Sequence, residues 1–346
     1  MRNFTLSARS LRRNPLYEGA VKIAKMLGGA VAVVVMLFGA LVGWLAVRSP
    51  AMRPALTEPV ERTPERLARG KHLAENITGC MECHSEHRDD LFMWPAKPET
   101  YGQGGFPFDE RLGIPGVVCA QNITPDPETG LGNWTDGEII RAIREGVAKD
   151  GRALFPMMPY QSLRAMSDED VKAIVVYLRS LKPIRKETPP VRLDFPVNLL
   201  IKFDPQPLDG PVAAPNPADH LAYGKYLVTL AGCADCHTNH LKGKPVKGME
   251  FAGGWELRLP WGRLVPPNIT PDPETGIGNL TRYEFIGRFK SFASLVELPK
   301  ALPGRNTIMN WRGYGQMAED ELGAMYDYLR TVKPIKNKVN PFPDAT

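Results

Sequence analysis

The sequence predicts a mostly α-helical protein in which two similar domains follow one apolar N-terminal helix. Three observations support this fold class. Met26–Val47 is 22 residues long and contains no charged side chain. The rest of the chain contains an internal repeat. Apolar residues recur mainly at helical spacing, and the alternation typical of strands is sparse.

The apolar stretch Met26–Val47 is expected to be an uncleaved membrane anchor. As a helix it would be about 33 Å long, enough to cross the hydrocarbon core of a bilayer. The residues before it contain six Lys or Arg and one acid, Glu18, which predicts a cytoplasmic amino end and an exported remainder. A cleaved signal peptide is the alternative. The apolar run is longer than the apolar region of a signal peptide, which is usually about 7–15 residues. No small-x-small cleavage site follows it, so the anchor is favoured.

The positive charge of the chain is concentrated in its first 48 residues. These contain seven Lys or Arg and one acid, a balance of +6. The remainder has 43 − 7 = 36 basic and 38 − 1 = 37 acidic residues, a balance of −1. A nucleic-acid-binding module would need a basic patch on a folded domain, so nucleic acid is not an expected partner.

The chain after the anchor contains a duplicated domain. Residues 122–130, Asn-Ile-Thr-Pro-Asp-Pro-Glu-Thr-Gly, recur without change at 268–276. Nine prolines between 183 and 217 exclude a regular element there. The predicted organisation is a cytoplasmic tail and anchor (1–48), a Pro-rich stalk (49–64), a first domain (65–183), a Pro-rich linker (184–217) and a second domain (218–346).

Each copy is expected to begin and end with a helix. Residues 65–79 and 218–232 are predicted as short helices that lead to the motif described next. Ser167 is predicted to cap the closing helix of the first copy, because acids follow it in the first turn. The apolar stripes predicted to face the core are Val171, Ile174, Val175 and Leu178, and in the second copy Leu322, Met325, Tyr326 and Leu329.

Each copy also carries one Cys-x-x-Cys-His motif, which is typical of covalent c-type haem attachment. The motifs comprise Cys80, Cys83 and His84 in the first copy, and Cys233, Cys236 and His237 in the second. A zinc site is less favoured because the cysteine pairs lie far apart in sequence and each has its own histidine. A chain of 346 residues does not need disulfides to build a core. We therefore predict two haem c groups, with His84 and His237 as iron ligands.

The sixth iron ligand is predicted to be a methionine, because a thioether opposite histidine is a recognised c-type pair. Met158 and Met309 are favoured by register, since each lies eight residues before another methionine, Met166 or Met317. Met157 is the alternative in the first copy. Core packing is the other role that these methionines could have.

The sequence resembles the membrane-anchored cytochrome c subunits that serve bacterial periplasmic dehydrogenases for alcohols, gluconate and aldehydes. The resemblance covers about 66–334 and rests on the two haem motifs, the repeated nine-residue loop, and Met-Pro-Tyr followed by the closing helix. It implies two tandem class I cytochrome c domains, whereas such subunits often have three. It also implies that Asn122 and Asn268 approach the haem propionates. Trp134 is a further propionate-side residue, and its counterpart Leu280 cannot donate a hydrogen bond.

The expected function is single-electron transfer by a single-pass protein of the bacterial inner membrane whose haem domains lie in the periplasm. The expected donor is a periplasmic dehydrogenase or membrane redox complex, and the expected acceptor is a downstream cytochrome or oxidase. No catalytic residue is predicted, because the protein's task would be to hold, insulate and tune the iron.

A haem enzyme is the competing class, either a two-haem peroxidase or a protein similar to thiosulfate dehydrogenases. The motive for the second is Cys119, the one cysteine outside the two motifs. A thiolate there could ligate iron. The simpler interpretation is a buried, unreactive thiol, since free cysteine is among the most buried residue types.

Overall fold

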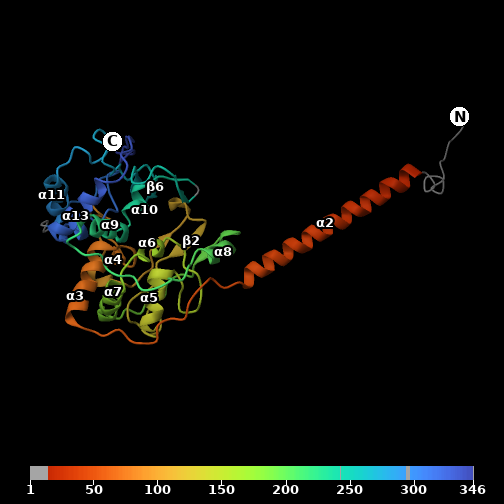
Figure 1. Cartoon of the computed structure of the whole chain (residues 1–346), viewed down its shortest axis with the longest axis horizontal. Helices are drawn as coiled ribbons and strands as arrows, with labels where there is room; N and C mark the ends of the chain where they lie inside the picture. The colour runs from red at the N-terminus through yellow and green to blue at the C-terminus, as the bar shows by residue number, and fades with distance from the viewer. Residues whose placement is uncertain (1–14, 242, 294–296, 346) are drawn as a thin grey trace. The chain divides into compact units, whose positions relative to one another are not determined.

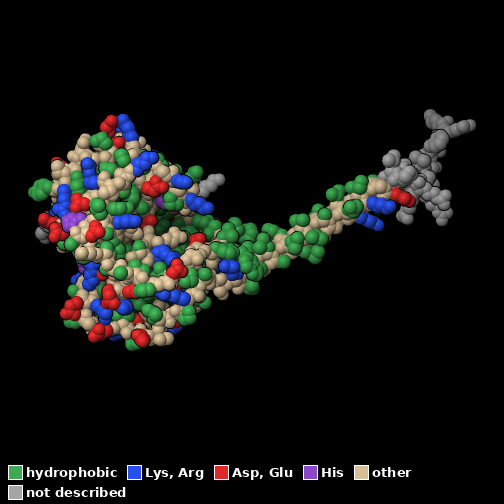
Figure 2. Space-filling model, viewed as in Figure 1, with side chains coloured by type: hydrophobic (Ala, Val, Ile, Leu, Met, Phe, Trp, Pro, Cys, Tyr) green, Lys and Arg blue, Asp and Glu red, His purple; other side chains and the backbone are tan. Residues whose placement is uncertain are grey.

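The computed structural model describes residues 15–241, 243–293 and 297–345. They fall into two compact units, one up to Ser49 and the other from Pro50 onward. The first unit is the helix α2 (Pro15–Val47) (Figure 1). Its stretch Glu18–Val47 is long and apolar enough to cross a membrane, and no other helix among the described residues is. Figure 2 shows hydrophobic side chains along this helix, which agrees with the predicted anchor.

The second unit is built on two matching pairs of helices. The helix α3 (Pro64–His72) packs on α7 (Asp168–Ser180), and α9 (His220–Leu230) packs on α13 (Glu319–Leu329). Both contacts depend on glycine. A Cβ at Gly70 would lie 1.9 Å from the carbonyl oxygen of Ala173. A Cβ at Gly224 would lie 1.9 Å from the carbonyl oxygen of Ala324. The mostly helical prediction is confirmed, and these four helices agree with the predicted first and last helices of each copy.

The remaining elements are short. They lie in sequence between the helices of each pair or, from Arg192 to Phe203, between the two pairs. A π-helical turn (Leu73–Ile77) continues α3, and the 3-10 turns are Pro98–Thr100, Glu110–Leu112 and Ile201–Phe203. The other helices are α4 (Cys80–Cys83), α5 (Asp136–Glu145), α6 (Tyr160–Leu163), α8 (Val197–Leu200), α10 (Cys233–His237), α11 (Arg282–Ala293) and α12 (Trp311–Gln316). The strands are β1 (Pro107–Phe108), β2 (Gly116–Cys119), β3 (Arg192–Leu193), β4 (His240–Leu241), β5 (Lys244–Pro245), β6 (Leu257–Leu259) and β7 (Gly262–Leu264). They pair antiparallel in the order β1-β2-β3, β4-β5 and β6-β7.

Local capping explains where the closing helices begin. The backbone N–H of Asp170 donates to the Ser167 hydroxyl at 3.1 Å, so the predicted cap of α7 is confirmed. At the same place in the second copy, α13 has Ala318, which has no side-chain acceptor. There the Ala318 N–H donates to the Glu321 carboxylate at 3.0 Å. The two helices therefore start with the same backbone geometry but different caps.

One hydrophobic core extends through both copies. Leu73, Ile77 and Ile174 from the first copy belong to the same cluster as Leu227 and Leu322 from the second. The predicted stripes face this core, with all their members buried except Tyr326, which is half-buried. The two helix pairs therefore share one hydrophobic core instead of each enclosing a core of its own.

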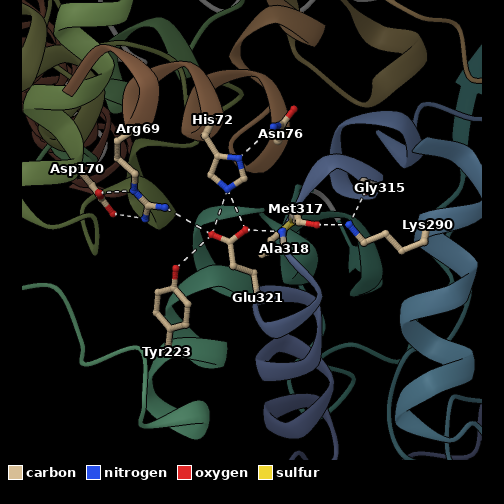
Figure 3. Close-up of polar contacts among 10 residues, drawn as sticks. All are labelled: Arg69, His72, Asn76, Asp170, Tyr223, Lys290, Gly315, Met317, Ala318 and Glu321. Carbon is tan, nitrogen blue, oxygen red and sulfur yellow. Dashed lines mark hydrogen bonds and ion pairs between the residues drawn. The ribbon is translucent and has the colours of Figure 1, made fainter. Parts of the chain in front are cut away.

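A polar network joins the two copies beside this core (Figure 3). The guanidinium of Arg69 on α3 forms two bonds with Asp170 of its own copy, at 2.9 and 3.0 Å. It also lies 3.5 Å from Glu321 of the other copy. Glu321 further contacts His72 Nε2 at 2.9 Å and accepts from the Tyr223 hydroxyl at 3.2 Å.

Asp170 has the reciprocal arrangement. The hydroxyl of Tyr226 on α9 donates to Asp170 at 2.7 Å and accepts from the Ser167 N–H at 3.0 Å. Residues of both first helices therefore contact the acid in the first turn of each closing helix. Such a network holds the two copies in one register.

The Pro-rich segments lie against the body of the second unit. In the segment predicted as a stalk, Arg53 pairs with buried Glu145 at 2.6 Å, and the Val60 N–H donates to Asp136 at 2.9 Å. Both partners belong to α5. In the segment predicted as a linker, β3 extends the sheet of β1 and β2. The expectation that the linker contains no regular element is therefore wrong, because β3, α8 and the 3-10 turn Ile201–Phe203 lie in it. These elements are short enough to fit between the prolines.

Candidate functional site

The two Cys-x-x-Cys-His motifs have the same local structure. Gly79 and Gly232 precede them in the left-handed conformation, with φ of 62° and 63°. This geometry favours glycine and turns the chain into the short helices α4 and α10. None of the five cysteines forms a disulfide. The thiols of each motif are therefore available for attachment to another group.

The two motifs lie beside each other although they are 153 residues apart in sequence. Burial raises the pKa of Cys83 to about 12, and Cys236 of the other motif contributes to the rise. The ring of Tyr314 lies close to both motifs. Burial raises its pKa, and the charges of Cys233, Cys236 and Glu82 raise it further. The fold thus brings both candidate attachment sites together at the contact between the two copies.

The histidines of the motifs are oriented for metal binding. Nδ1 of His84 contacts the carbonyl oxygen of Gln121 at 2.6 Å, and Nδ1 of His237 contacts that of Pro267 at 2.7 Å. A carbonyl only accepts, so each Nδ1 donates and each Nε2 keeps a free lone pair. A backbone carbonyl that orients a histidine in this way is common around protein-bound metals. Burial also lowers the pKa of both histidines, which favours the neutral ligand form.

These residues fit a covalently held haem. Each copy offers two thiols and one neutral, oriented imidazole. Among the described residues there is no cluster of three or more His, Cys, Asp or Glu side chains suited to a bare metal ion. The donor set therefore matches a haem better than a zinc ion.

The repeated nine-residue loop positions the carbonyls that the histidines contact. Gln121 and Pro267, which carry these carbonyls, directly precede the two copies of the loop. The buried Asn122 side chain donates to Thr129 at 2.9 Å and to the Ile184 carbonyl at 2.7 Å, and it accepts from the Thr124 N–H at 2.9 Å. Asn268 makes the matching three bonds, at 3.0, 2.6 and 2.9 Å. Each asparagine thus fastens its loop to the chain after the closing helix. Its predicted contact with a propionate stays a prediction.

The predicted methionine ligands are half-buried and pack against the core. Met158, Met309 and Trp134 are each partly buried against the hydrophobic core. Met166 and Met317, which set their register, are fully buried core residues. Met157 is also half-buried, so the choice between Met157 and Met158 stays a prediction.

Cys119 lies at the end of β2, where it pairs with Pro107 of β1. It is buried, and burial raises the pKa of its thiol. The protonated form is a poor ligand, because the thiolate is the nucleophile and metal ligand. The structure thus favours the simpler interpretation of Cys119.

Two features of the site were missed by sequence reasoning. The carbonyls of Gln121 and Pro267 orient the histidines, and the hydroxyl of Tyr314 donates to the carbonyl of Ala231, two residues before Cys233, at 3.1 Å. Gln121 and Pro267 each precede the repeated loop by one residue, and that position is the only sequence signal for their role. Nothing in the sequence distinguishes Tyr314 from an ordinary core aromatic.

Comparison with known proteins agrees with this site. Residues 67–182 match the cytochrome c family. The chain is 27% identical to an alcohol dehydrogenase (quinone) cytochrome c subunit of Gluconacetobacter polyoxogenes, over 81% of this chain and 59% of the relative. It is 28% identical to a fructose dehydrogenase cytochrome subunit of Gluconobacter japonicus, over 81% and 56%. It is 29% identical to a diheme cytochrome c-type protein of Cereibacter sphaeroides, over 81% and 93%.

The share of each relative that this chain covers differs among them. The chain spans a little under three fifths of the alcohol and fructose dehydrogenase subunits and nearly all of the diheme protein. The resemblance inferred from the motifs is confirmed: the chain carries a cytochrome c domain and is similar to the cytochrome c subunits of quinone alcohol and fructose dehydrogenases and to a diheme cytochrome c.

Proposed function

We propose that this chain is an electron carrier that moves single electrons through two covalently bound haems c. The attachment residues would be Cys80 and Cys83 for one haem and Cys233 and Cys236 for the other. The axial ligands would be His84 with Met158, and His237 with Met309. The observation that supports this most strongly is the duplicated site: two motifs lie close together, each with a histidine that donates Nδ1–H to a loop carbonyl.

The haem iron would supply the one-electron chemistry. The carbonyls of Gln121 and Pro267 fix the ring orientation of the two histidines. Asn122 and Asn268 hold the loops that carry these carbonyls. Cys80 and Cys233, one from each motif, both pack against the shared hydrophobic core. A buried, low-dielectric site and fixed axial ligands are the means by which a protein sets a haem potential.

The proposed domain organisation follows the duplication. Two class I cytochrome c domains, 65–183 and 218–346, would be joined by the linker 184–217. Residues 1–48 would form the cytoplasmic tail and single-pass anchor in a bacterial inner membrane, with 49–64 after it and the haem domains in the periplasm. The apolar helix and its basic flank support this arrangement.

The proposed electron donor is a dehydrogenase. The names of the similar cytochrome subunits, which belong to quinone alcohol dehydrogenase and fructose dehydrogenase, support a partner of this class. A downstream cytochrome or oxidase would take the electrons. Gentle purification of the full chain from membranes tests the donor, with a dehydrogenase subunit expected to accompany it.

A redox titration of the full chain in detergent tests the electron-carrier function. Two one-electron steps are expected in the haem absorbance. The paired changes Cys80→Ala with Cys83→Ala, and Cys233→Ala with Cys236→Ala, should each remove one step. A chain that binds haem but shows an iron position open to peroxide or cyanide in the untreated protein would instead favour a haem enzyme.

A further inference from the structure

The segment after each candidate methionine ligand lies against the opposite copy. The helix α6 begins two residues after Met158 and packs on α9 of the second copy. The helix α12 begins two residues after Met309 and packs on the π-helical turn Leu73–Ile77 of the first copy. The segment that follows each candidate methionine therefore contacts the other copy as well as its own.

Asn310, the residue next to Met309, makes this crossing through a direct hydrogen bond. Its Nδ2 donates to the carbonyl oxygen of Glu75 in the first copy at 3.0 Å. Its Oδ1 accepts from the Gly313 N–H at 2.9 Å and so caps α12. One side chain thus fastens the residue beside Met309 to its own helix and to the other copy.

The acceptor of this bond is itself held in place. Glu75 lies in the last helical turn before Gly79, where carbonyls usually lack partners within the helix. Its carboxylate accepts a short hydrogen bond from the hydroxyl of Tyr177 on α7. The carbonyl of Glu75 is therefore a fixed point to which Asn310 can anchor the segment.

The crossing in the other direction uses different chemistry. The counterpart of Asn310 is Pro159, which has no N–H and no side-chain donor. The Ser162 hydroxyl instead donates to Asp235, within the second motif, at 3.0 Å. Ser162 lies four residues after Met158. Pro159, the residue next to Met158, therefore donates no hydrogen bond to the other copy, in contrast to Asn310.

We propose that Asn310 is a positioning residue for Met309, and that its bond to Glu75 makes the iron–methionine bond of the second haem depend on the first copy. This proposal rests on the proposed function, because it takes Met309 as an iron ligand. Loss of the bond should weaken methionine ligation at the second haem and leave the first haem unchanged.

Two substitutions at position 310 separate the two roles of the side chain. Asn310→Asp keeps an oxygen that can cap α12 but cannot donate to the Glu75 carbonyl. Asn310→Ala removes both bonds. Ser162→Ala is the matched change after the other methionine, and Met309→Ala defines the part of the signal that belongs to the second haem.

The readout is the weak red absorption band that reports the sulfur–iron bond of oxidised haem, followed as the protein is warmed. We expect Asn310→Asp and Asn310→Ala each to lower the equilibrium constant for ligation about fivefold, as the loss of one hydrogen bond implies. The change should fall within the part of the band that Met309→Ala removes, and Ser162→Ala should spare that part.

Three outcomes would overturn the proposal. Asn310→Asp could behave like the unaltered protein while Asn310→Ala weakens the band, which would leave Asn310 only its capping role. Both variants could leave the band unchanged. Met309→Ala could also leave it unchanged. The intact mass of each variant separates these results from a failure of the proposed function, which would show as fewer than two attached haems.

Discussion

The two copies share their scaffold but differ where they face each other. Each has a glycine-mediated helix pair, an asparagine-fastened loop and a histidine bonded to a loop carbonyl. At the junction, Arg69 and His72 in one copy correspond to Tyr223 and Tyr226 in the other. The residues that orient the two motif histidines were therefore kept alike after duplication, while those at the junction became complementary.

The difference extends to the methionine segments. Tyr160, two residues after Met158, is buried against Gly146. Its counterpart Trp311 is half-buried and lies beside Phe289 and Phe292, with ring centroids 5.1 and 5.2 Å away. Unequal surroundings of this kind predict unequal haem potentials.

The largest expected effect tests the likeness of the two helix pairs. Gly70→Ala and Gly224→Ala would each place a Cβ 1.9 Å from a backbone oxygen. Each should lower the free energy of unfolding by about 3 kcal/mol through overpacking. Denaturant unfolding of the full chain in detergent measures this, with Gly210→Ala as control because its Cβ would meet no atom within 4 Å. A small effect at only one glycine would contradict the equivalence of the pairs.

The next effect concerns the fastened loops. Asn122→Ala and Asn268→Ala leave buried partners without a hydrogen bond, so each should cost about 2 kcal/mol. Each should also shift the potential of the haem in its own copy, because the loop carries the carbonyl that orients the histidine. Redox titration and unfolding together check this. A change in the potential of the opposite haem alone would count against the assignment.

The junction network predicts a dependence on pH. Burial alone would raise the pKa of Glu321, but hydrogen bonding and charge from His72, together with Arg69 and the Ala318 N–H, lower it below 4.5. A carboxyl group whose pKa is lowered by folding stabilises the folded protein at any pH above its ordinary pKa. This stabilisation is lost as the pH falls through the pKa that the group has in the folded protein. Glu321→Gln should therefore be less stable by about 1.5 kcal/mol at neutral pH.

The lowered pKa of Glu321 also predicts how the stabilities of Glu321→Gln and the unaltered protein compare at low pH. The gap between Glu321→Gln and the unaltered chain should narrow as pH falls below about 4.5, measured by unfolding midpoints across that range. Glu319→Gln is a suitable control, because Glu319 is exposed in the same helical turn. A gap independent of pH would remove Glu321 from the ionised network.

The smallest effect concerns the caps of the closing helices. Ser167→Ala should cost about 1 kcal/mol, because Ser167 accepts from the Asp170 N–H. Ala318→Ser should stabilise the protein by about 0.5 kcal/mol, since Ala318 has nearly the same backbone angles as Ser167. Opposite signs are expected in thermal unfolding. Equal signs would show that the two helix starts are not equivalent.

Local features of this fold could be predicted from the sequence, while contacts between the copies could not. The cap at Ser167 and the stripe through Ile174 follow from residue type and helical period, which are properties of neighbouring residues. The bond from Asn310 to Glu75 joins residues 235 positions apart, and no periodicity encodes it. The packing of Arg53 on Glu145 was likewise hidden, because prolines predict an irregular chain but not what it contacts.

The intact mass of the full-length protein tests the account most directly. We predict the mass of the polypeptide plus two haems, and a loss of one haem when the cysteines of either motif are changed to alanine. A polypeptide of bare mass, or a chain in which one pair of cysteines carries no haem, would contradict it.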